Sequence, residues 1–140
     1  MNLKGKRAIV TGGGRGLGKA VALILAKEGV DVGITGRNEE NLKNTVEEIK
    51  AIGVKGCYSV FNIDDEIDVI AGIDVLVAQL GGLDILINNA GIGNFGTLEN
   101  MSTQDWEQVI KTNLFGVYYT AKAAHQYLKL SGEADIVNVA

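Results

Sequence analysis

The residues with the clearest chemical potential lie near the N-terminus, where the chain reads Thr-Gly-Gly-Gly-Arg-Gly-Leu-Gly at positions 11 to 18. This stretch follows the apolar run 8–10, which is typical of a parallel strand buried on both faces. Glycine lets an anion approach the backbone without meeting a Cβ, and a helix start presents free N–H groups and a partial positive charge. The apolar spacing after the turn predicts that helix, on Leu17, Ala20, Val21, Ile24 and Leu25. The sequence therefore predicts a strand, a glycine turn and a helix that bind a pyrophosphate.

Two familiar phosphate-binding patterns fit this turn incompletely. In the P-loop pattern, Ala20 stands where a hydroxyl should hold magnesium. In the Gly-x-Gly-x-x-Gly pattern, Leu17 stands where the third glycine should be. The pattern Thr-Gly-x-x-x-Gly-x-Gly fits at every position from Thr11 to Gly18. A tight turn that holds no ligand is the alternative interpretation.

Strand-like and helix-like segments alternate along the whole chain, which predicts βαβ units with a parallel sheet. The expected strands span 8–10, 31–35, 54–61, 83–88 and 134–139, and the expected helices after the first span 38–52, 65–80 and 103–130. We therefore expect an α/β fold over residues 1–140, a Rossmann-type doubly wound parallel sheet in three layers that is truncated after the fifth strand. The expected inward face of helix 38–52 consists of Leu42, Thr45, Val46 and Ile49, with Gly53 just past its end. The apolar residues expected on one face of helix 103–130 are Trp106, Val109, Ile110, Leu114, Val117 and Ala121.

Composition excludes several classes of function. The 140 residues carry a net charge of −4, which gives no general attraction to nucleic acid or to an anionic membrane. No apolar run approaches the roughly 20 residues that span a bilayer, so we expect a cytoplasmic protein. The single cysteine, Cys57, is interpreted as a core residue. No metal site is expected, because the one histidine is His125 and the acidic cluster 64–68 fits a helix start that its carboxylates cap.

The end of the second expected strand indicates which dinucleotide is bound. In dinucleotide-binding folds an acid about 20 residues beyond the glycine turn binds the ribose of NAD, whereas a nearby arginine accommodates the 2′-phosphate of NADP. Here Gly36 occupies the acid position and Arg37 follows it, while Arg15 supplies a second cation from the glycine turn. The sequence therefore favours NADP(H), and two solvated surface arginines are the alternative.

Two further polar signals fall near the expected strand ends. Asn88, Asn89, Ala90 and Gly91 directly follow the fourth strand, where amides and a close backbone suit a ribose or nicotinamide. Asn113 lies on the expected apolar stripe of helix 103–130, where a buried amide needs a partner or a task. We interpret Asn113 as catalytic or water-holding, with a purely structural hydrogen bond as the alternative.

The glycine motif at 11–18, Asp84 before the fourth strand, the run 88–91 and Lys111-Thr112-Asn113 together resemble the short-chain dehydrogenase/reductase family over the full length of the chain. Within it, the chain looks most similar to the 3-oxoacyl-acyl-carrier-protein reductases. The residues expected to bind the cofactor are Thr11, Gly12, Gly13, Gly14, Arg15, Gly16, Leu17, Gly18, Arg37, Asn62, Ile63, Asn89, Ala90 and Gly91. The resemblance implies that Asn113 is the active-site asparagine, and that Asn62 replaces an aspartate that contacts the adenine.

The resemblance also implies an activity, hydride transfer between NADP(H) and a carbonyl or alcohol substrate, which could be a 3-oxoacyl thioester of fatty acid biosynthesis. The family's serine, tyrosine and lysine would lie beyond the fifth strand, so we expect this chain to be part of a longer polypeptide and inactive alone. Tyr118 and Lys122 match the Tyr-x-x-x-Lys letters, but they precede that strand and are interpreted as a coincidence. The alternative function is a non-catalytic dinucleotide-binding or assembly module. A homo-oligomer, a dimer or tetramer built on helix 103–130, is expected by analogy.

Overall fold

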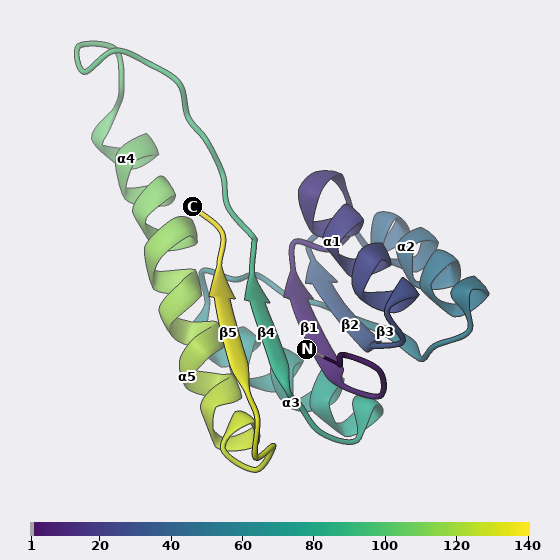
Figure 1. Cartoon of the computed structure of the whole chain (residues 1–140). Helices are drawn as coiled ribbons and strands as arrows, with labels where there is room; N and C mark the ends of the chain where they lie inside the picture. The colour runs from purple at the N-terminus through teal and green to yellow at the C-terminus, as the bar shows by residue number, and fades with distance from the viewer. Residues whose placement is uncertain (1) are drawn as a thin grey trace.

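The computed structural model describes residues 2–140, which form a five-stranded parallel sheet in the order β3-β2-β1-β4-β5 (Figure 1). The strands are β1 (Arg7–Thr11), β2 (Asp31–Gly36), β3 (Gly56–Val60), β4 (Ile85–Asn88) and β5 (Asp135–Asn138). The chain adds strands outward from β1 to β3, then returns to the other side of β1 with β4 and β5. Strand order thus reverses between β1 and β4, and the prediction of a doubly wound Rossmann-type sheet is confirmed.

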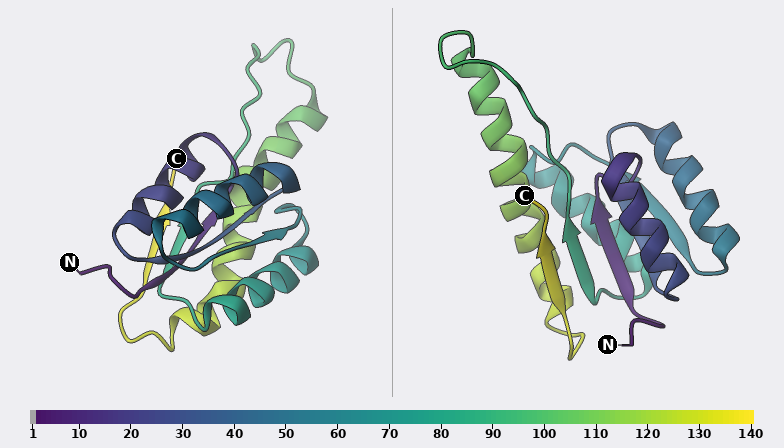
Figure 2. Two further views of the ribbon diagram at one scale, coloured as in Figure 1. Left: turned by 90° about the vertical axis from the view of Figure 1, so that its right-hand side faces the viewer. Right: turned by 45° about the horizontal axis from the view of Figure 1, so that its top comes forward.

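Helices cover both faces of the sheet and complete the three layers. They are α1 (Gly16–Lys27), α2 (Glu39–Ile52), α3 (Glu66–Leu80), α4 (Thr103–Ile110) and α5 (Gly116–Leu128), with one turn of π-helix at Lys111–Phe115. Figure 2 shows α1 and α2 side by side on one face, and α3 and α5 lie against each other on the opposite face. Alternate residues of β1 point to the two faces, so Ala8 and Val10 pack in one core and Ile9 in the other.

Helix α2 has the face that the sequence predicts. The expected residues Leu42, Thr45, Val46 and Ile49 are its buried residues, and Gly53 ends the helix in the left-handed conformation with φ 107°. Asn38 caps the start, because its side chain accepts a hydrogen bond from the backbone N–H of Asn41. This helix was predictable because its polar and apolar residues separate cleanly around its axis.

Helix α1 forms where the apolar spacing predicts it, and small residues make up its buried face. Its buried residues are Gly18, Ala22 and Ala26, whereas Leu17 and Ile24 are each 59 % exposed. Small residues face the sheet because α1 packs closely against it. The spacing of the large apolar residues therefore indicates the helix but not which of its residues are buried. The predicted helix is confirmed, and its most buried residues are not the large apolar ones that indicated it.

The predicted helix 103–130 forms as α4, the π turn and α5, and its predicted apolar face is only partly buried. The buried positions include Thr112, Gly116 and Thr120, whereas the expected Trp106 and Leu114 are each 58 % exposed. A π turn adds a residue to one helical turn, so a spacing of 3.6 residues cannot be followed through it. The upper part of this helix stands clear of the sheet, and α4 has no buried residue (Figure 1).

The fifth strand lies at the edge of the sheet and is exposed along its whole length. Ile136 and Val137 are each 46 % exposed, although β5 pairs in parallel with β4 from Asp135 to Asn138. An apolar strand edge of this kind is a template for further pairing. Throughout residues 2–140, every helix is too short or too polar to cross a lipid bilayer.

Candidate functional site

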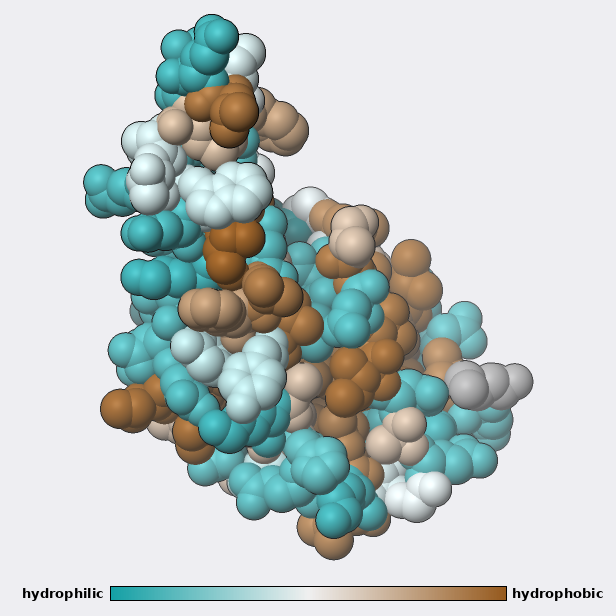
Figure 3. Space-filling model, turned by 90° about the vertical axis from the view of Figure 1, so that its left-hand side faces the viewer, coloured by the Kyte–Doolittle hydropathy of each residue, from teal (hydrophilic) through white to brown (hydrophobic). Residues whose placement is uncertain are grey.

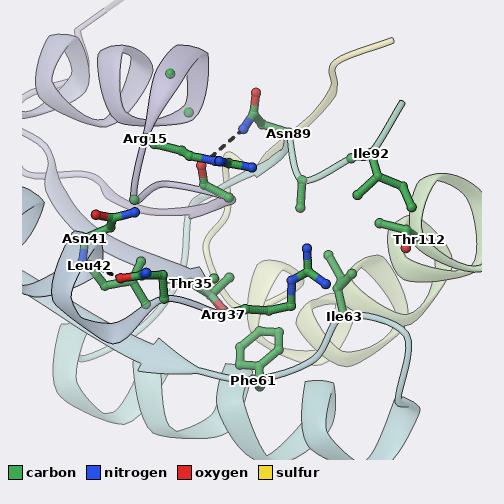
Figure 4. Close-up of a pocket in the computed structure, with 18 of the residues that line it drawn as sticks. Arg15, Thr35, Arg37, Asn41, Leu42, Phe61, Ile63, Asn89, Ile92 and Thr112 are labelled. Carbon is green, nitrogen blue, oxygen red and sulfur yellow. Dashed lines mark hydrogen bonds between the residues drawn. The ribbon is translucent and has the colours of Figure 1, made fainter. Parts of the chain in front are cut away.

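A cavity of about 500 Å³ opens at the carboxyl ends of β1, β2 and β3, beside the loop that follows β4 (Figure 4). In a doubly wound sheet this edge, at the point where strand order reverses, is where ligands bind. Five parts of the chain line the cavity. They are the glycine turn, the end of β2 with the segment after it, the segment after β3, the segment after β4, and the π turn. These lining residues are Gly12, Gly14, Arg15, Gly16, Leu17, Gly18, Thr35, Gly36, Arg37, Asn38, Asn41, Leu42, Phe61, Asn62, Ile63, Asp64, Asn89, Ala90, Gly91, Ile92 and Thr112.

The glycine turn brings the backbone to the cavity through close packing. A Cβ at Gly18 would lie 2.2 Å from the carbonyl oxygen of Gly12 and 2.4 Å from Nδ2 of Asn89. Both distances are too short for non-bonded atoms, so only glycine fits at this position. Gly16 serves another need, since its φ of 55° lies in the left-handed region and its surroundings are open. The first turn of α1 therefore starts at the cavity with its N–H groups free for an anion.

Thr11 positions the site without entering the cavity. Its side chain is fully buried, and Oγ1 accepts hydrogen bonds from the backbone N–H groups of Asn89 and Ala90, both at 3.0 Å. Asn89 returns the contact, because its Nδ2 donates to the carbonyl oxygen of Thr11 at 3.0 Å. These bonds fix the loop after β4 against the glycine turn, so Thr11 acts through its neighbours.

Arg15 and Arg37 bring positive charge to the cavity from two directions. Arg15 extends from the glycine turn and Arg37 from the end of β2, and both side chains reach toward the cavity (Figure 4). In the described part of the chain, neither guanidinium lies within 4.0 Å of a carboxylate oxygen, although six other cationic side chains are paired in this way. Two unpaired guanidinium groups beside one cavity form a suitable site for a phosphate.

Thr35, at the end of β2, carries an unsatisfied polar atom on the cavity wall. Thr35 is 2 % exposed. Among residues 2–140, its Oγ1 is the one buried side-chain polar atom that has no hydrogen-bond partner. A buried hydroxyl without a partner is costly, so its presence beside a cavity indicates a ligand group that bonds it. With the glycine turn and the two arginines, it shows that these residues fit a dinucleotide.

Asn113 does not lie where the sequence predicts. It is exposed rather than buried, because the face that carries Leu114 points to solvent. Its side chain holds the loop after β4, since Oδ1 accepts from the backbone N–H of Ile92 and Nδ2 donates to the carbonyl of Ile92, both at 2.8 Å. The interpretation as a buried amide was wrong, and its catalytic role stays a prediction.

The segment after β3 forms the remaining wall of the cavity. Asn62 and Ile63 line the cavity as the sequence predicts, and Asp64 lines it as well. Of the acidic cluster 64–68, Asp65 caps α3 by accepting from the backbone N–H groups of Ile67 and Asp68, as expected. Asp64 instead accepts a hydrogen bond at 2.8 Å from Oγ1 of Thr112. In the part of the chain that the structure describes, no group of three metal-ligating side chains could hold a metal ion.

Most of the predicted cofactor-binding residues line the cavity, but two do not. Thr11 lies behind the wall, and Gly13 is buried beneath the turn, where a Cβ would meet the side chain of Ile34 at 2.6 Å. The sequence reasoning missed these lining residues: Thr35, Gly36, Asn38, Asn41, Leu42, Phe61, Asp64, Ile92 and Thr112. Thr35 and Phe61 end or directly follow strands, so the rule that ligands bind at the carboxyl ends of strands could have found them.

Two other residues singled out in the sequence lie away from the cavity. Lys122 forms an ion pair with Glu66 at 2.8 Å and lies over the ring of Tyr118, and neither Tyr118 nor Lys122 lines the cavity. Cys57 is buried, and burial raises the pKa of its thiol to about 11. A thiol of this kind is a core group rather than a nucleophile.

The fold and the site together define a dinucleotide-binding α/β protein, and comparison with known proteins gives the family. A family model for short chain dehydrogenases matches residues 6–140. The chain therefore belongs to the short-chain dehydrogenase family, and the resemblance inferred from its motifs is confirmed.

Two curated relatives give the range of known activities. The chain is 38 % identical over 138 residues to gluconate 5-dehydrogenase of Gluconobacter oxydans, covering 99 % of this chain and 54 % of that protein. It is 40 % identical over 135 residues to 3-oxoacyl-acyl-carrier-protein reductase of Staphylococcus aureus, covering 96 % of this chain and 55 % of that protein. The chain thus spans about half the length of the curated relatives that it matches.

Two solved structures show both forms of the cofactor. A short chain dehydrogenase from Burkholderia cenocepacia in complex with NADP has a TM-score of 0.87 and 37 % identity, covering 91 % of this chain and 53 % of that one. An NAD⁺-bound xylitol dehydrogenase has a TM-score of 0.93 and 31 % identity, covering 99 % of this chain and 54 % of that one. Solved relatives of this chain therefore hold a nicotinamide dinucleotide, NADP in one and NAD⁺ in the other.

Proposed function

We propose that this chain binds NADP(H) and forms the cofactor-binding part of an oxidoreductase that acts on a carbonyl or alcohol substrate. The observation that carries the proposal is the pair of unpaired guanidinium groups, Arg15 and Arg37, beside a cavity where Gly36 replaces the acid that would bind NAD. A 2′-phosphate between them would gain two charge-assisted contacts. Each such contact contributes about 1.5 to 3 kcal/mol, which is roughly ten- to a hundredfold in affinity.

The other walls suit the remaining parts of the dinucleotide. The backbone N–H groups of Gly16 to Gly18 would bind the pyrophosphate at the start of α1, and the buried hydroxyl of Thr35 would offer a hydrogen bond. Asn62 and Ile63 form the wall for the adenine, while Asn89, Ala90 and Gly91 form the wall for the ribose and nicotinamide. The bound nicotinamide would supply or accept the hydride. The residues of this chain bind and orient it, and Asn113 keeps the nicotinamide wall in place through Ile92.

The similarity to gluconate 5-dehydrogenase and to 3-oxoacyl-acyl-carrier-protein reductase supports two substrate classes for the whole protein, a small polyol or sugar acid and an acyl-carrier-bound 3-oxoacyl thioester. We also propose that it forms a homo-oligomer. Figure 3 shows apolar side chains along the outer side of the helix that runs from α4 to α5. This surface includes Trp106, Leu114, Phe115 and Tyr118, each more than 40 % exposed. An exposed apolar surface of this kind marks an interaction site.

Fluorescence titration with NADPH and, separately, with NADH tests the cofactor proposal. We expect NADPH to bind at least tenfold more tightly, because only NADPH presents a 2′-phosphate to the two arginines. Replacing Arg37 or Arg15 by Ala should weaken NADPH binding about ten- to a hundredfold and leave NADH binding nearly unchanged. The matched control is Lys27→Ala, which removes an exposed cation outside the cavity. Equal affinities for NADPH and NADH in the unaltered protein would overturn the choice of NADP(H).

A second candidate function is a dinucleotide-binding module without catalysis. It rests on the same cavity, because the glycine turn and the two arginines would bind a dinucleotide whether or not a reaction follows. An assay of NADPH oxidation with 3-oxoacyl thioesters and with keto sugar acids separates the two functions. Tight binding with no turnover of either substrate class by the complete protein would establish the second.

A further inference from the structure

An acidic residue in the cavity wall is held by the neighbouring helix. Asp64, between β3 and α3, accepts a hydrogen bond from Oγ1 of Thr112 at 2.8 Å and another from Nε2 of Gln108. Nε2 of Gln108 also lies 3.3 Å from Oγ1 of Thr112, so the three side chains form a closed network. Gln108 and Thr112 are four residues apart, one on α4 and the other in the π turn.

The residue before Asp64 packs on the next turn of the same helix. A Cβ at Gly116 would lie 2.9 Å from Cγ1 of Ile63 and 3.3 Å from its carbonyl oxygen, so Ile63 lies directly on the helix backbone. The loop is folded on itself, because Asn62 Oδ1 accepts from the backbone N–H of Asp64 at 3.3 Å. Positions 108, 112 and 116 thus form one stripe of the helix that holds the wall made by Asn62, Ile63 and Asp64.

The same π turn holds the opposite wall through the next residue. Asn113 binds the backbone of Ile92 on the loop after β4 with two hydrogen bonds of 2.8 Å. Thr112 and Asn113 therefore point their side chains at two walls of one cavity, Thr112 at the segment after β3 and Asn113 at the segment after β4. A π turn is a frequent feature of functional sites, where it changes the direction of neighbouring side chains.

We infer that Asp64 is a positioning residue that, with Thr112 and Gln108, holds the Asn62–Ile63 wall at a fixed separation from the wall that Asn113 holds. This inference rests on the proposed function, because the two walls would contact opposite ends of the dinucleotide. The network fixes the width of the cavity before the cofactor arrives, so less conformational freedom is lost on binding. Loosening it should weaken cofactor binding without removing any group that touches the cofactor phosphates.

The test combines NADPH titration with amide hydrogen exchange of the unliganded protein. Thr112→Val removes only the hydroxyl, and we expect NADPH to bind about three- to tenfold more weakly. Thr112→Ser keeps the hydroxyl and should restore affinity to within about twofold of the unaltered protein. Asp64→Ala should weaken binding to a similar extent. The double variant should bind no more weakly than Asp64→Ala alone, because Asp64→Ala already removes the contact that Thr112→Val breaks.

Exchange at residues 62 to 64 should accelerate in Thr112→Val and in Asp64→Ala, and should be unchanged in the matched controls Thr103→Val and Asp68→Ala. Neither control residue lines the cavity. Unchanged exchange at 62 to 64 in both network variants overturns the inference, whatever the titration shows. Faster exchange with unaltered NADPH affinity overturns the link to binding. If the unaltered protein does not bind NADPH, the proposed function fails, while the exchange measurement still decides whether the network holds the wall.

Discussion

The two ends of the parallel strands use polar groups in opposite ways. At the amino end, Asp84 Oδ2 accepts hydrogen bonds at 2.8 Å from the backbone N–H and from Nε of Arg7, and Oδ1 accepts one at 2.9 Å from Nη2. Nη1 of Arg7 donates to the carbonyl of Gly81, and Ser131 donates to Asp84. Arg7 and Asp84 are therefore paired at this end, and with Ser131 they join the start of β1 to the segments before β4 and β5.

At the carboxyl end, polar groups are left without partners in the described chain. Arg15 and Arg37 have no carboxylate within 4.0 Å, and Oγ1 of Thr35 has no hydrogen-bond partner. We infer that stability and binding are divided between the two ends of one sheet. Changes at the amino end should reduce the free energy of unfolding and leave NADPH affinity unchanged. Polar changes at the carboxyl end should weaken NADPH binding without reducing the free energy of unfolding.

The largest effect is expected from Gly18→Ala, which breaks this division because it disturbs both properties. The added Cβ would meet the carbonyl oxygen of Gly12 at 2.2 Å, and neither the turn nor α1 can move away without losing its packing. We expect unfolding to require about 3 kcal/mol less, with loss of detectable NADPH binding. Urea denaturation and NADPH fluorescence titration measure the two effects.

The control lies two residues earlier in the same turn. Gly16→Ala adds a methyl group in open space, so only its left-handed backbone opposes the change, at about 1 to 2 kcal/mol. A loss of stability in Gly18→Ala no larger than that in Gly16→Ala would show that the close approach to Gly12 does not require glycine at Gly18.

Asp84→Asn should produce the next largest effect, at the amino end alone. Only 10 % of the Asp84 side chain is exposed, and the substitution leaves the Arg7 guanidinium without its anionic partner. We expect the free energy of unfolding to fall by about 2 to 3 kcal/mol, with NADPH affinity unchanged within about twofold. The matched control is Glu48→Gln, which breaks the more exposed pair with Lys19 and should cost less than about 0.5 kcal/mol. A large fall in NADPH affinity in Asp84→Asn would contradict the division between the two ends.

The same ion pair predicts how stability depends on pH. Hydrogen bonds from the Arg7 guanidinium lower the pKa of Asp84 from 3.8 to about 2. Because the folded state favours the ionised carboxylate, its contribution is complete above pH of about 4 and disappears as the pH falls toward 2. The depression corresponds to about 2 kcal/mol. Urea midpoints measured between pH 2 and 5 should show this slope in the unaltered protein and a shallower slope in Asp84→Asn. Equal slopes in the two proteins would show that other carboxylates cause the acid sensitivity.

Much of the fold was predictable because local patterns and topology agree. The glycine turn, the buried strands and the face of α2 each follow from the spacing of apolar and glycine residues, and the doubly wound order follows from their alternation. The cavity edge was predictable for the same reason, since Arg15, Arg37 and Asn89 lie at the carboxyl ends of strands or beside them.

The failures come from contacts that a periodic pattern does not describe. In α1 the close approach to the sheet selects Gly18, Ala22 and Ala26 over the larger residues. In the long helix the π turn changes the phase, so Asn113 points to the loop after β4 rather than into the core. Asp64 looked like a helix cap, and only the folded chain places Thr112 beside it.

The smallest expected effect is at Thr35, and its sign is the sharpest test of the carboxyl end. Thr35→Val keeps the shape of the side chain and removes a buried hydroxyl that has no partner in the described residues. The unliganded protein should therefore become more stable by up to about 1 kcal/mol, because a desolvated hydroxyl is no longer buried. NADPH should bind more weakly, by about three- to tenfold, if the cofactor supplies the missing partner. Thermal unfolding with and without NADPH measures both changes, with Thr45→Val as the control, because the hydroxyl of Thr45 is already bonded to the carbonyl of Asn41 at 3.0 Å. Stabilisation of Thr35→Val with unaltered NADPH affinity would mean that the unpaired hydroxyl serves no ligand, and the free polar groups of this edge would then be reduced to the two arginines.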